Sequence, residues 1–381
     1  MPAVSRRRAA AAAVDLALQG GGSHGAFTWG VLDRLLEDES LPLDGVSGTS
    51  AGALNAAVLA TGFAEGGRAG ARAALRAFWL DVGGQGGCFG QNTWPSVSGW
   101  PASGSWAGWP GAGPWAGWPL PPALATPLAG FNLDHHPGYA LMQQFLRAFS
   151  PYQFNPYDLN PLREVVRRHV HEPALRRGPL SVFVTATSVR TGQPRVFDRD
   201  DLGVDALLAS ACLPQLFKAV VIDGEPFWDG GYSGNPAIWP LIYRTQAMDV
   251  MLVKINPLVR LDTPDTPEEI ADRVNEITFN AGLVSEMRAI AFVQRLVEQG
   301  RVDPGQYKDL RLHMVADEAG LAPLHPSSKL NTDAKFLESL FDLGRVAAAT
   351  WLAAHRDDIG RCSTLDVAAT FLAPRRTAGG R

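Results

Sequence analysis

The sequence has little cysteine and no long run of charge of one sign. Its 381 residues hold three cysteines, Cys88, Cys212 and Cys362. Their wide spacing and odd number argue against a disulfide framework or a cysteine-rich metal knuckle, and a reducing cytoplasm fits best. The 34 basic and 38 acidic residues give a net charge of −4. Without a basic stripe carrying interleaved aromatic residues, the chain has no footprint of a nucleic-acid partner.

Metal-binding spacings are also missing. None of the eight histidines forms an i,i+4 pair with an intervening acid, as a zinc helix would. His135 and His136 are adjacent, but neighbouring imidazoles point apart and no further ligands lie nearby. We therefore expect no metal and no cofactor.

The first residues only partly match a signal peptide. Arg6 to Arg8 precede the apolar run Ala9 to Ala13, but this run is short and merges into the first predicted strand. Cleavage there would damage the glycine-rich loop described below. We expect a cytoplasmic protein with flexible termini at residues 1–13 and 374–381.

Residues 82–133 contain no charged side chain. Recurrent prolines exclude a membrane-spanning helix, so we predict a Trp/Gly/Pro-rich insertion at about 83–130. It could be a low-complexity surface loop. Alternatively, because tryptophan favours the water–lipid boundary, it could contact membranes or lipid aggregates peripherally. Its tryptophans are Trp94, Trp100, Trp106, Trp109, Trp115 and Trp118.

Residues Gly48 to Gly52 read Gly-Thr-Ser-Ala-Gly, a G-x-S-x-G elbow that places Ser50 between a strand and a helix. The small flanking residues permit the strained turn. The following helix directs backbone N–H groups and its positive dipole end at a reacting carbonyl. Ser50 is thus a candidate nucleophile for acyl transfer.

A second glycine-rich segment precedes the elbow. Val14 to Gln19 alternates like a strand and leads into Gly20, Gly21, Gly22, Ser23, His24 and Gly25, and a helical pattern follows through Glu37. Free amides at such a helix start can bind an anion, which predicts an oxyanion hole beside Ser50. The G-x-G-x-x-G spacing also allows a dinucleotide site with Asp44 as its acidic residue, although Asp44 does not end a strand.

A third motif, Phe-Trp-Asp-Gly-Gly, spans Phe227 to Gly231 and places Asp229 at the end of a hairpin strand. An aspartate before two glycines often marks only a tight turn. In the order GGGSHG, GTSAG and DGG, however, the three motifs resemble the patatin-like phospholipases. Ala209 to Pro214 is similar to the block that this family carries between serine and aspartate. The resemblance covers roughly residues 14–245.

This resemblance implies a three-layer α/β/α fold with a mostly parallel central sheet, and a lipid acyl hydrolase with a Ser-Asp dyad. Ser50 would be the nucleophile and Asp229 the base, with Gly20, Gly21 and Gly22 as the oxyanion hole. The supporting motif positions would be Gly25, Gly48, Gly52, Gly230, Gly231 and His24. Lipid esters, as in phospholipase or lysophospholipase reactions, would be the substrates.

Two features depart from a simple match. An unperturbed aspartate has a pKa of about 3.9, far below that of an efficient base, so burial would have to raise the pKa of Asp229. His24 occupies a position where the family commonly has Arg or Lys. A neutral histidine there could donate a hydrogen bond to a bound head group or cap the helix start.

Two other functions stay open. A general α/β-hydrolase triad would need a histidine after Asp229, and His313, His325 or His355 could serve. Alternatively, a scaffold protein could keep the fold and bind lipid or granules through the Trp-rich insertion.

The remaining pattern is α/β. It predicts helices at 157–170 and 204–211, strands at 180–187 and 248–255, a long helix starting at Thr266 and Pro267 with a break near Gly282, and a helix from Phe336 to His355. We divide the chain into a hydrolase domain at 14–245 and a final strand with a C-terminal helical extension at 246–373.

Overall fold

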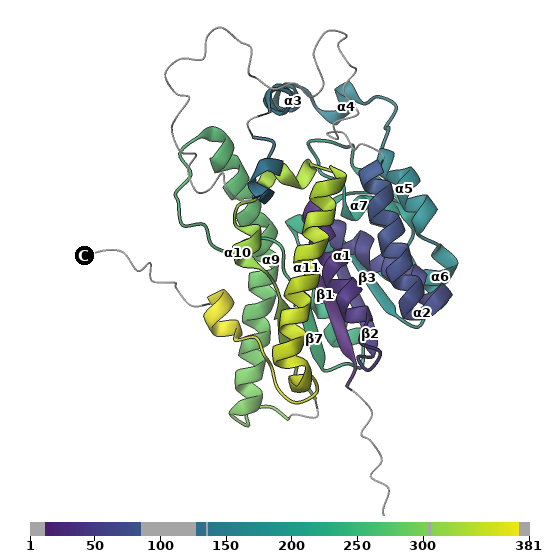
Figure 1. Cartoon of the computed structure of the whole chain (residues 1–381), viewed down its shortest axis with the longest axis vertical. Coiled ribbons are helices and arrows are strands. Elements are labelled where there is room, and N and C mark those ends of the chain that lie inside the picture. Colours follow the sequence, from purple (N-terminus) through teal and green to yellow (C-terminus); the bar gives the residue numbers. More distant parts are fainter. Residues whose placement is uncertain (1–11, 85–126, 135, 304–305, 373–381) are drawn as a thin grey trace, which may run out of the picture.

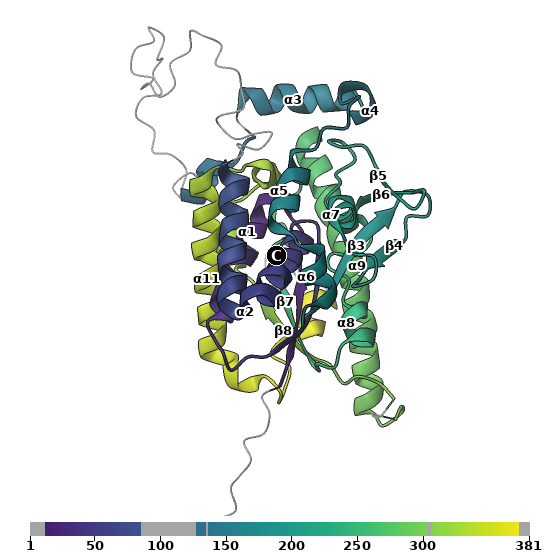
Figure 2. The same ribbon diagram turned by 90° about the vertical axis from the view of Figure 1, so that its right-hand side faces the viewer.

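The computed structural model describes residues 12–84, 127–134, 136–303 and 306–372 (Figure 1). The predicted insertion falls mostly at 85–126 and therefore lies outside the described residues, as do the two tails. The described part forms an α/β fold of three layers, with helices on both faces of one central sheet (Figure 2). This confirms the fold class predicted from the sequence.

The sheet has the strand order β5-β6-β3-β2-β1-β7-β8, with β4 paired to β3. The strands β3, β2, β1, β7 and β8 are mutually parallel, whereas β4, β5 and β6 form antiparallel pairs. The carboxyl ends of the parallel strands therefore meet at one edge, where α/β proteins bind ligands. The strands are β1 Val14–Leu18, β2 Leu43–Thr49, β3 Ser181–Ser188, β4 Pro194–Phe197, β5 Val220–Ile222, β6 Glu225–Asp229, β7 Asp249–Val253 and β8 Arg311–Val315.

Alternation along the buried strands divides the core between the two faces. On β7, Met251 and Val253 belong to a large apolar cluster with α1, α2 and α11, while Val250 and Leu252 belong to a second cluster with α8 and α9. The helices are α1 Gly25–Leu36, α2 Ala51–Gly84, α3 Pro137–Ala148, α4 Pro151–Phe154, α5 Pro161–His169, α6 Glu172–Arg177, α7 Val204–Ser210, α8 Trp239–Arg244, α9 Pro267–Glu298, α10 Glu318–Leu321 and α11 Ala334–His355. The helix α2 contains non-helical residues at Gly66 and Gly67.

The C-terminal third completes the layers. Strand β7 pairs with β1 and β8 pairs with β7, so both lie in the same sheet as the motif-bearing strands. Helix α11 lies along α1 (Figure 1), and a Cβ atom at Gly344 would meet the carbonyl oxygen of Phe27. The boundary at residue 245 stays a prediction.

Several elements differ from the sequence-based prediction. Helix α5 begins at Pro161, because Asn160 caps it and accepts a hydrogen bond from the Leu162 amide. Helix α9 begins at Pro267 behind the Thr266 cap, as predicted, but it is unbroken at Gly282. A Cβ at Gly282 would lie 2.8 Å from the Ser233 carbonyl oxygen, so this glycine permits close packing instead of ending a helix. Strand β8 was not predicted.

Within the described ranges, none of the helices combines the length and apolar character needed to cross a membrane.

The close approach of α1 and α11 generates a prediction. Gly344→Ala should destabilise the protein by about 1–3 kcal/mol, because the new methyl group would overlap the α1 backbone, although alanine favours helices by about 1 kcal/mol elsewhere. Thermal unfolding measures the effect, with the exposed Glu338→Ala in the same helix as control. A Gly344→Ala protein as stable as the Glu338→Ala protein would contradict the packing described.

Candidate active site

Ser50 occupies a strained turn between β2 and α2. Strand β2 ends at Thr49 and α2 begins at Ala51. The backbone of Ser50 has φ of 54°, a conformation that residues other than glycine rarely adopt. This is the geometry of a nucleophile elbow, in which the side chain projects from the carboxyl edge of the sheet.

Helix α7 and the strands β1 and β3 hold the elbow in place. The Ser50 amide donates to Ser210 Oγ at 2.9 Å, and the Ser210 hydroxyl donates to the Thr185 carbonyl oxygen at 2.6 Å. A side chain at Gly48 or Gly52 would collide with backbone, at Gly52 with the Leu18 carbonyl oxygen of β1. Contacts on several sides thus hold the strained turn in its conformation.

The glycine-rich loop lies directly against the elbow. A Cβ at Gly20 would lie 2.7 Å from Ser50 Cβ, and one at Gly25 would lie 2.8 Å from Ala51 Cβ. Gly22 has φ of 57°, the left-handed conformation suited to glycine. Within the described residues, the Gly21 and Gly22 amides donate no hydrogen bond to another protein group. They are therefore available to an anion beside Ser50.

The Gly20 amide, unlike the amides of Gly21 and Gly22, donates a hydrogen bond to a side chain. The acceptor is Asn235 Oδ1 at 2.6 Å, and the Gly20 carbonyl oxygen accepts from Asn256 Nδ2 at 2.7 Å. The buried Gln19 joins the same network, because its Oε1 accepts from the Ile255 and Asn256 amides, each at 2.9 Å. These amide side chains fix the loop. The bond to Asn235 uses the Gly20 N–H group, so this group is not available to an anion.

Asp229 ends β6 and is fully buried beside the elbow. Its Oδ1 accepts from the Gly231 amide at 2.7 Å, whereas Oδ2 accepts no hydrogen bond of ordinary geometry from the described residues. A Cβ at Gly230 would lie 3.0 Å from Thr49 Cγ2, so the aspartate turn packs on the residue that precedes Ser50. An unpaired buried carboxylate oxygen is costly and calls for a functional explanation.

Burial raises the pKa of Asp229 to about 7, because the charged form loses its hydration. The Gly231 amide, the Ser50 hydroxyl and the ammonium group of Lys329 each lower this pKa, in decreasing order, without cancelling the effect of burial. Of these groups, Ser50 lies 179 residues from Asp229 in the sequence.

The family model of the patatin-like phospholipases matches residues 16–242, more than half of the chain. The protein belongs to this family. The match covers Ser50, Asp229 and the glycine-rich loop, and the family supports lipid acyl hydrolase activity in general. The chain is also similar to the crystal structure of VipD from Legionella pneumophila, with a TM-score of 0.38, 12% identity, and coverage of 95% of this chain and 73% of that chain. A search of curated proteins finds no match.

His24 does not cap the helix start in this patatin-like protein, and its contact with a head group stays a prediction. Its side chain is buried, and Nε2 lies 2.8 Å from Ser328 Oγ. It precedes α1 but makes no side-chain capping bond. Burial first, and then the charges of Lys329 and Arg260, hold the pKa of His24 well below its ordinary value, so this imidazole is neutral at pH 7.

The three histidines considered for a triad are engaged with other acids. His313 Nε2 lies 3.0 Å from Asp249 Oδ1, His325 Nδ1 lies 3.1 Å from Asp134 Oδ2, and His355 Nδ1 lies 2.9 Å from Asp358 Oδ2. No histidine of the described residues bonds to Asp229, so the structure gives no support to a Ser-Asp-His triad.

The dinucleotide alternative also lacks support. Asp44 lies at the start of β2, and the glycine-rich loop follows the end of β1, which is parallel to it. The two features therefore lie at opposite edges of the sheet. Asp44 Oδ2 instead accepts from the Gln246 and Ala247 amides at 2.6 and 2.9 Å.

Sequence reasoning missed the residues that support the site. Ser210 lies within Ala209 to Pro214, the block similar to the family, so the sequence already indicated that this position belongs near the site. The other supporting residues carry no motif of their own. They are Gln19 after β1, Asn256 after β7 and Asn235 before α8. Only the strand order brings them together.

The buried carboxyl group predicts a pH-dependent stability. Between about pH 4 and pH 7 the unfolded chain has lost the Asp229 proton while the folded protein keeps it, so this group's contribution to stability falls as pH rises through that window. Each pKa unit corresponds to about 1.4 kcal/mol. Asp229→Asn should therefore raise the melting temperature over wild type more at pH 8 than at pH 5.

The control is Asp342→Asn, which changes an exposed carboxyl group on α11. Its shift in melting temperature should be small and the same at both pH values. An Asp229→Asn shift that does not grow with pH would mean that Asp229 titrates as an ordinary aspartate.

Proposed function

We propose that the protein is a serine acyl hydrolase that cleaves carboxylic esters of lipids through a dyad of Ser50 and Asp229. The observation that carries this proposal is the buried carboxyl group with a pKa of about 7 beside a serine on a strained elbow. A general base works best when its pKa lies near the operating pH. Burial removes the objection that an ordinary aspartate would be too weak.

In the first half-reaction, Ser50 Oγ attacks the ester carbonyl carbon and its proton passes to Oδ2 of Asp229. The electron pair of the C=O bond moves to the oxygen. When the tetrahedral intermediate collapses, the ester C–O bond breaks and the departing alcohol takes the proton from Asp229. An acyl-serine remains.

In the second half-reaction, water attacks the acyl-serine and gives its proton to Asp229. The bond to Ser50 Oγ breaks, the serine regains a proton and a carboxylic acid leaves. Both half-reactions pass through an oxyanion. We assign its stabilisation to the Gly21 and Gly22 amides, since the Gly20 amide already donates to Asn235. One such donor is worth about 3 kcal/mol.

The dyad predicts a specific pattern of inactivation. Ser50→Ala should abolish both ester hydrolysis and labelling by a fluorophosphonate probe, because the nucleophile is absent. Asp229→Asn should lower both by about 10²-fold or more, because the base is absent. Hydrolysis is measured on a panel of phospholipids, lysophospholipids, glycerides and simple esters.

Asp342→Asn serves as the matched control and should behave as wild type. Hydrolysis and labelling that persist in Ser50→Ala would refute the dyad. An intact wild-type protein that hydrolyses none of these esters and takes up no probe would favour the lipid-binding scaffold.

We further propose peripheral contact with membranes or lipid aggregates through the Trp-rich insertion. Support comes from exposed apolar side chains on the segment that follows it. Helices α3 and α4 lie at the same end of the molecule as the carboxyl ends of the parallel strands (Figure 2). This segment, residues 141–159, exposes Leu141, Phe145, Phe149, Tyr152, Tyr157 and Leu159.

This contact predicts a difference between aggregated and soluble substrates. Deleting residues 99–119, or changing Leu141 and Phe149 together to Ser, should lower hydrolysis of phospholipid vesicles more than hydrolysis of a soluble short-chain ester. Changing Tyr243 and Val346 to Ser, which are exposed on α8 and α11, provides the control. Equal losses on both substrates would count against the lipid contact.

A further inference from the structure

The two amides assigned to the oxyanion belong to two successive peptide units. The Gly21 N–H group shares a unit with the Gly20 carbonyl group, and the Gly22 N–H group shares one with the Gly21 carbonyl group. Both units are trans, so in each of them the N–H and C=O bonds point in opposite directions. A hydrogen bond that holds the carbonyl oxygen of a unit therefore also sets the direction of its N–H group.

The second of these units is held by the backbone of the loop itself. The Gly21 carbonyl oxygen accepts from the His24 amide at 3.2 Å, in the 3-10 turn Gly22–His24 that leads into α1. This bond forms with the turn and requires no particular side chain. The direction of the Gly22 N–H group is therefore a property of the local backbone.

The first unit is held by side chains that are distant in the sequence. The Gly20 carbonyl oxygen accepts from Asn256 Nδ2 at 2.7 Å and, in a longer bond, from Asn235 Nδ2 at 3.4 Å. Asn256 follows β7, is buried, and lies beyond residue 242, where the match to the family model ends. Because its bond is the shorter one, Asn256 is the main support of the unit that carries the Gly21 N–H group.

The carboxamide of Asn256 has one orientation that satisfies its partners. Nδ2 faces two acceptors, the Gly20 carbonyl oxygen and Gln19 Oε1, the latter at 3.3 Å. Oδ1 faces a donor, Lys329 Nζ, at 2.8 Å. An inverted carboxamide would place its NH₂ group against the lysine donor and its oxygen against two other oxygens. The side chain is therefore locked with its N–H group toward Gly20.

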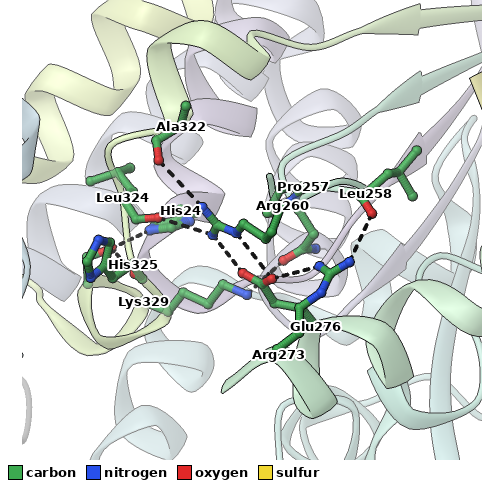
Figure 3. A network of polar contacts seen from close by, with 12 residues as sticks. His24, Pro257, Leu258, Arg260, Arg273, Glu276, Ala322, Leu324, His325 and Lys329 are labelled. Atoms are coloured by element: carbon green, nitrogen blue, oxygen red, sulfur yellow. Dashed lines mark hydrogen bonds and ion pairs between the residues drawn. The ribbon is translucent and has the colours of Figure 1, made fainter. Parts of the chain in front are cut away.

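Lys329 reaches Asn256 from a turn that follows β8. It lies in the 3-10 turn Pro326–Leu330. Figure 3 shows its side chain extending toward Glu276, which pairs with Arg260 at 2.7 Å. A lysine nitrogen can donate a hydrogen bond with or without its extra proton, so its contact with Asn256 does not depend on its charge.

We propose that Asn256 is a positioning residue of the reaction, which aims the Gly21 N–H group by holding the Gly20 carbonyl oxygen. The target of this N–H group is the oxyanion that forms beside Ser50, so the inference rests on the proposed function. A donor that is aimed before the reaction needs no reorganisation when the charge develops. The bond from Asn256 also polarises the peptide unit, which makes its N–H group a stronger donor.

The test uses two variants of Asn256 in the full-length protein, with a neutral p-nitrophenyl ester as substrate. Asn256→Asp keeps the size and an acceptor for Lys329, but an ionised aspartate cannot donate to the Gly20 carbonyl oxygen. Asn256→Ala loses the same donor without adding a charge, and it carries the test if Asn256→Asp does not fold. Both half-reactions pass through an oxyanion, so kcat should fall by about 10²-fold in each variant while KM changes little.

A tetrahedral inhibitor separates positioning from general damage. Ser50 Oγ adds to the carbonyl carbon of a trifluoromethyl ketone, and the ketone oxygen becomes an anion where the oxyanion of the reaction forms. The inhibition constant of this ketone should rise by the same factor as kcat/KM falls, because both quantities report the same lost donor.

Gln294→Glu is the matched control. Gln294 Nε2 also donates to a backbone carbonyl oxygen, that of Leu310, at 2.8 Å. Leu310 directly precedes β8, at the edge of the sheet opposite the glycine-rich loop. This variant loses a comparable bond, and its kcat and inhibition constant should stay at their wild-type values.

Wild-type values of kcat in the Asn256 variants would overturn the inference. A loss confined to KM, a loss that the inhibition constant does not follow, or an equal loss in Gln294→Glu would overturn it as well. Ser50→Ala in the same assay distinguishes this result from a failure of the proposed function. If Ser50→Ala remains active, the proposed function itself fails. If it is inactive while the Asn256 variants behave as wild type, only the role of Asn256 fails.

Discussion

The site depends on one costly arrangement, the burial of the Asp229 carboxyl group at the end of β6. Oδ1 has a single backbone donor, and Oδ2 has no partner of ordinary geometry among the described residues. A carboxyl group placed so resists ionisation, and its pKa rises to about 7. In the proposed mechanism, the free energy lost in burial makes the aspartate a base of suitable strength for a neighbouring serine. Function and local instability therefore have the same origin.

The folded protein can keep this carboxyl group buried because the sheet and the neighbouring helices hold the residues of the site from several sides. Ser50 follows β2, the glycine-rich loop follows β1 and Asn256 follows β7, all at the carboxyl edge of parallel strands. The elbow is further bonded to Ser210 on α7, and the loop is bonded to Asn235 and Asn256. Strain at Ser50 and an unpaired oxygen at Asp229 persist because the rest of the network leaves them no alternative.

The motifs allowed much of this to be predicted from the sequence. The elbow, the glycine-rich loop and the Asp-Gly-Gly turn are local patterns, and each lies where a strand meets a turn, as expected. The order of the three motifs indicated the family and therefore the three layers. Local patterns also predicted the Thr266 cap of α9 and the helix α11.

What the sequence did not reveal depends on contacts between distant segments. Gly282 was interpreted as a helix break, yet it lies inside α9, and a glycine fits there because the Ser233 backbone passes close to it. Gln19, Asn235 and Asn256 carry no local signal, and they come together only because the ends of β1 and β7 and the turn before α8 lie side by side. The pKa of Asp229 was equally inaccessible, since the dielectric around a carboxyl group is a property of packing and not of its neighbours in the chain.

The central claim is that Asp229 is a buried carboxyl group that ionises near neutral pH. Isotope-labelled aspartate, observed by ¹³C NMR during a pH titration, tests it most directly, with Asp229→Asn identifying the resonance. The account predicts that the carboxyl resonance missing from the variant titrates with a pKa of about 7 in the wild-type protein. An Asp229 resonance that titrates near pH 4, as in an exposed aspartate, would contradict it.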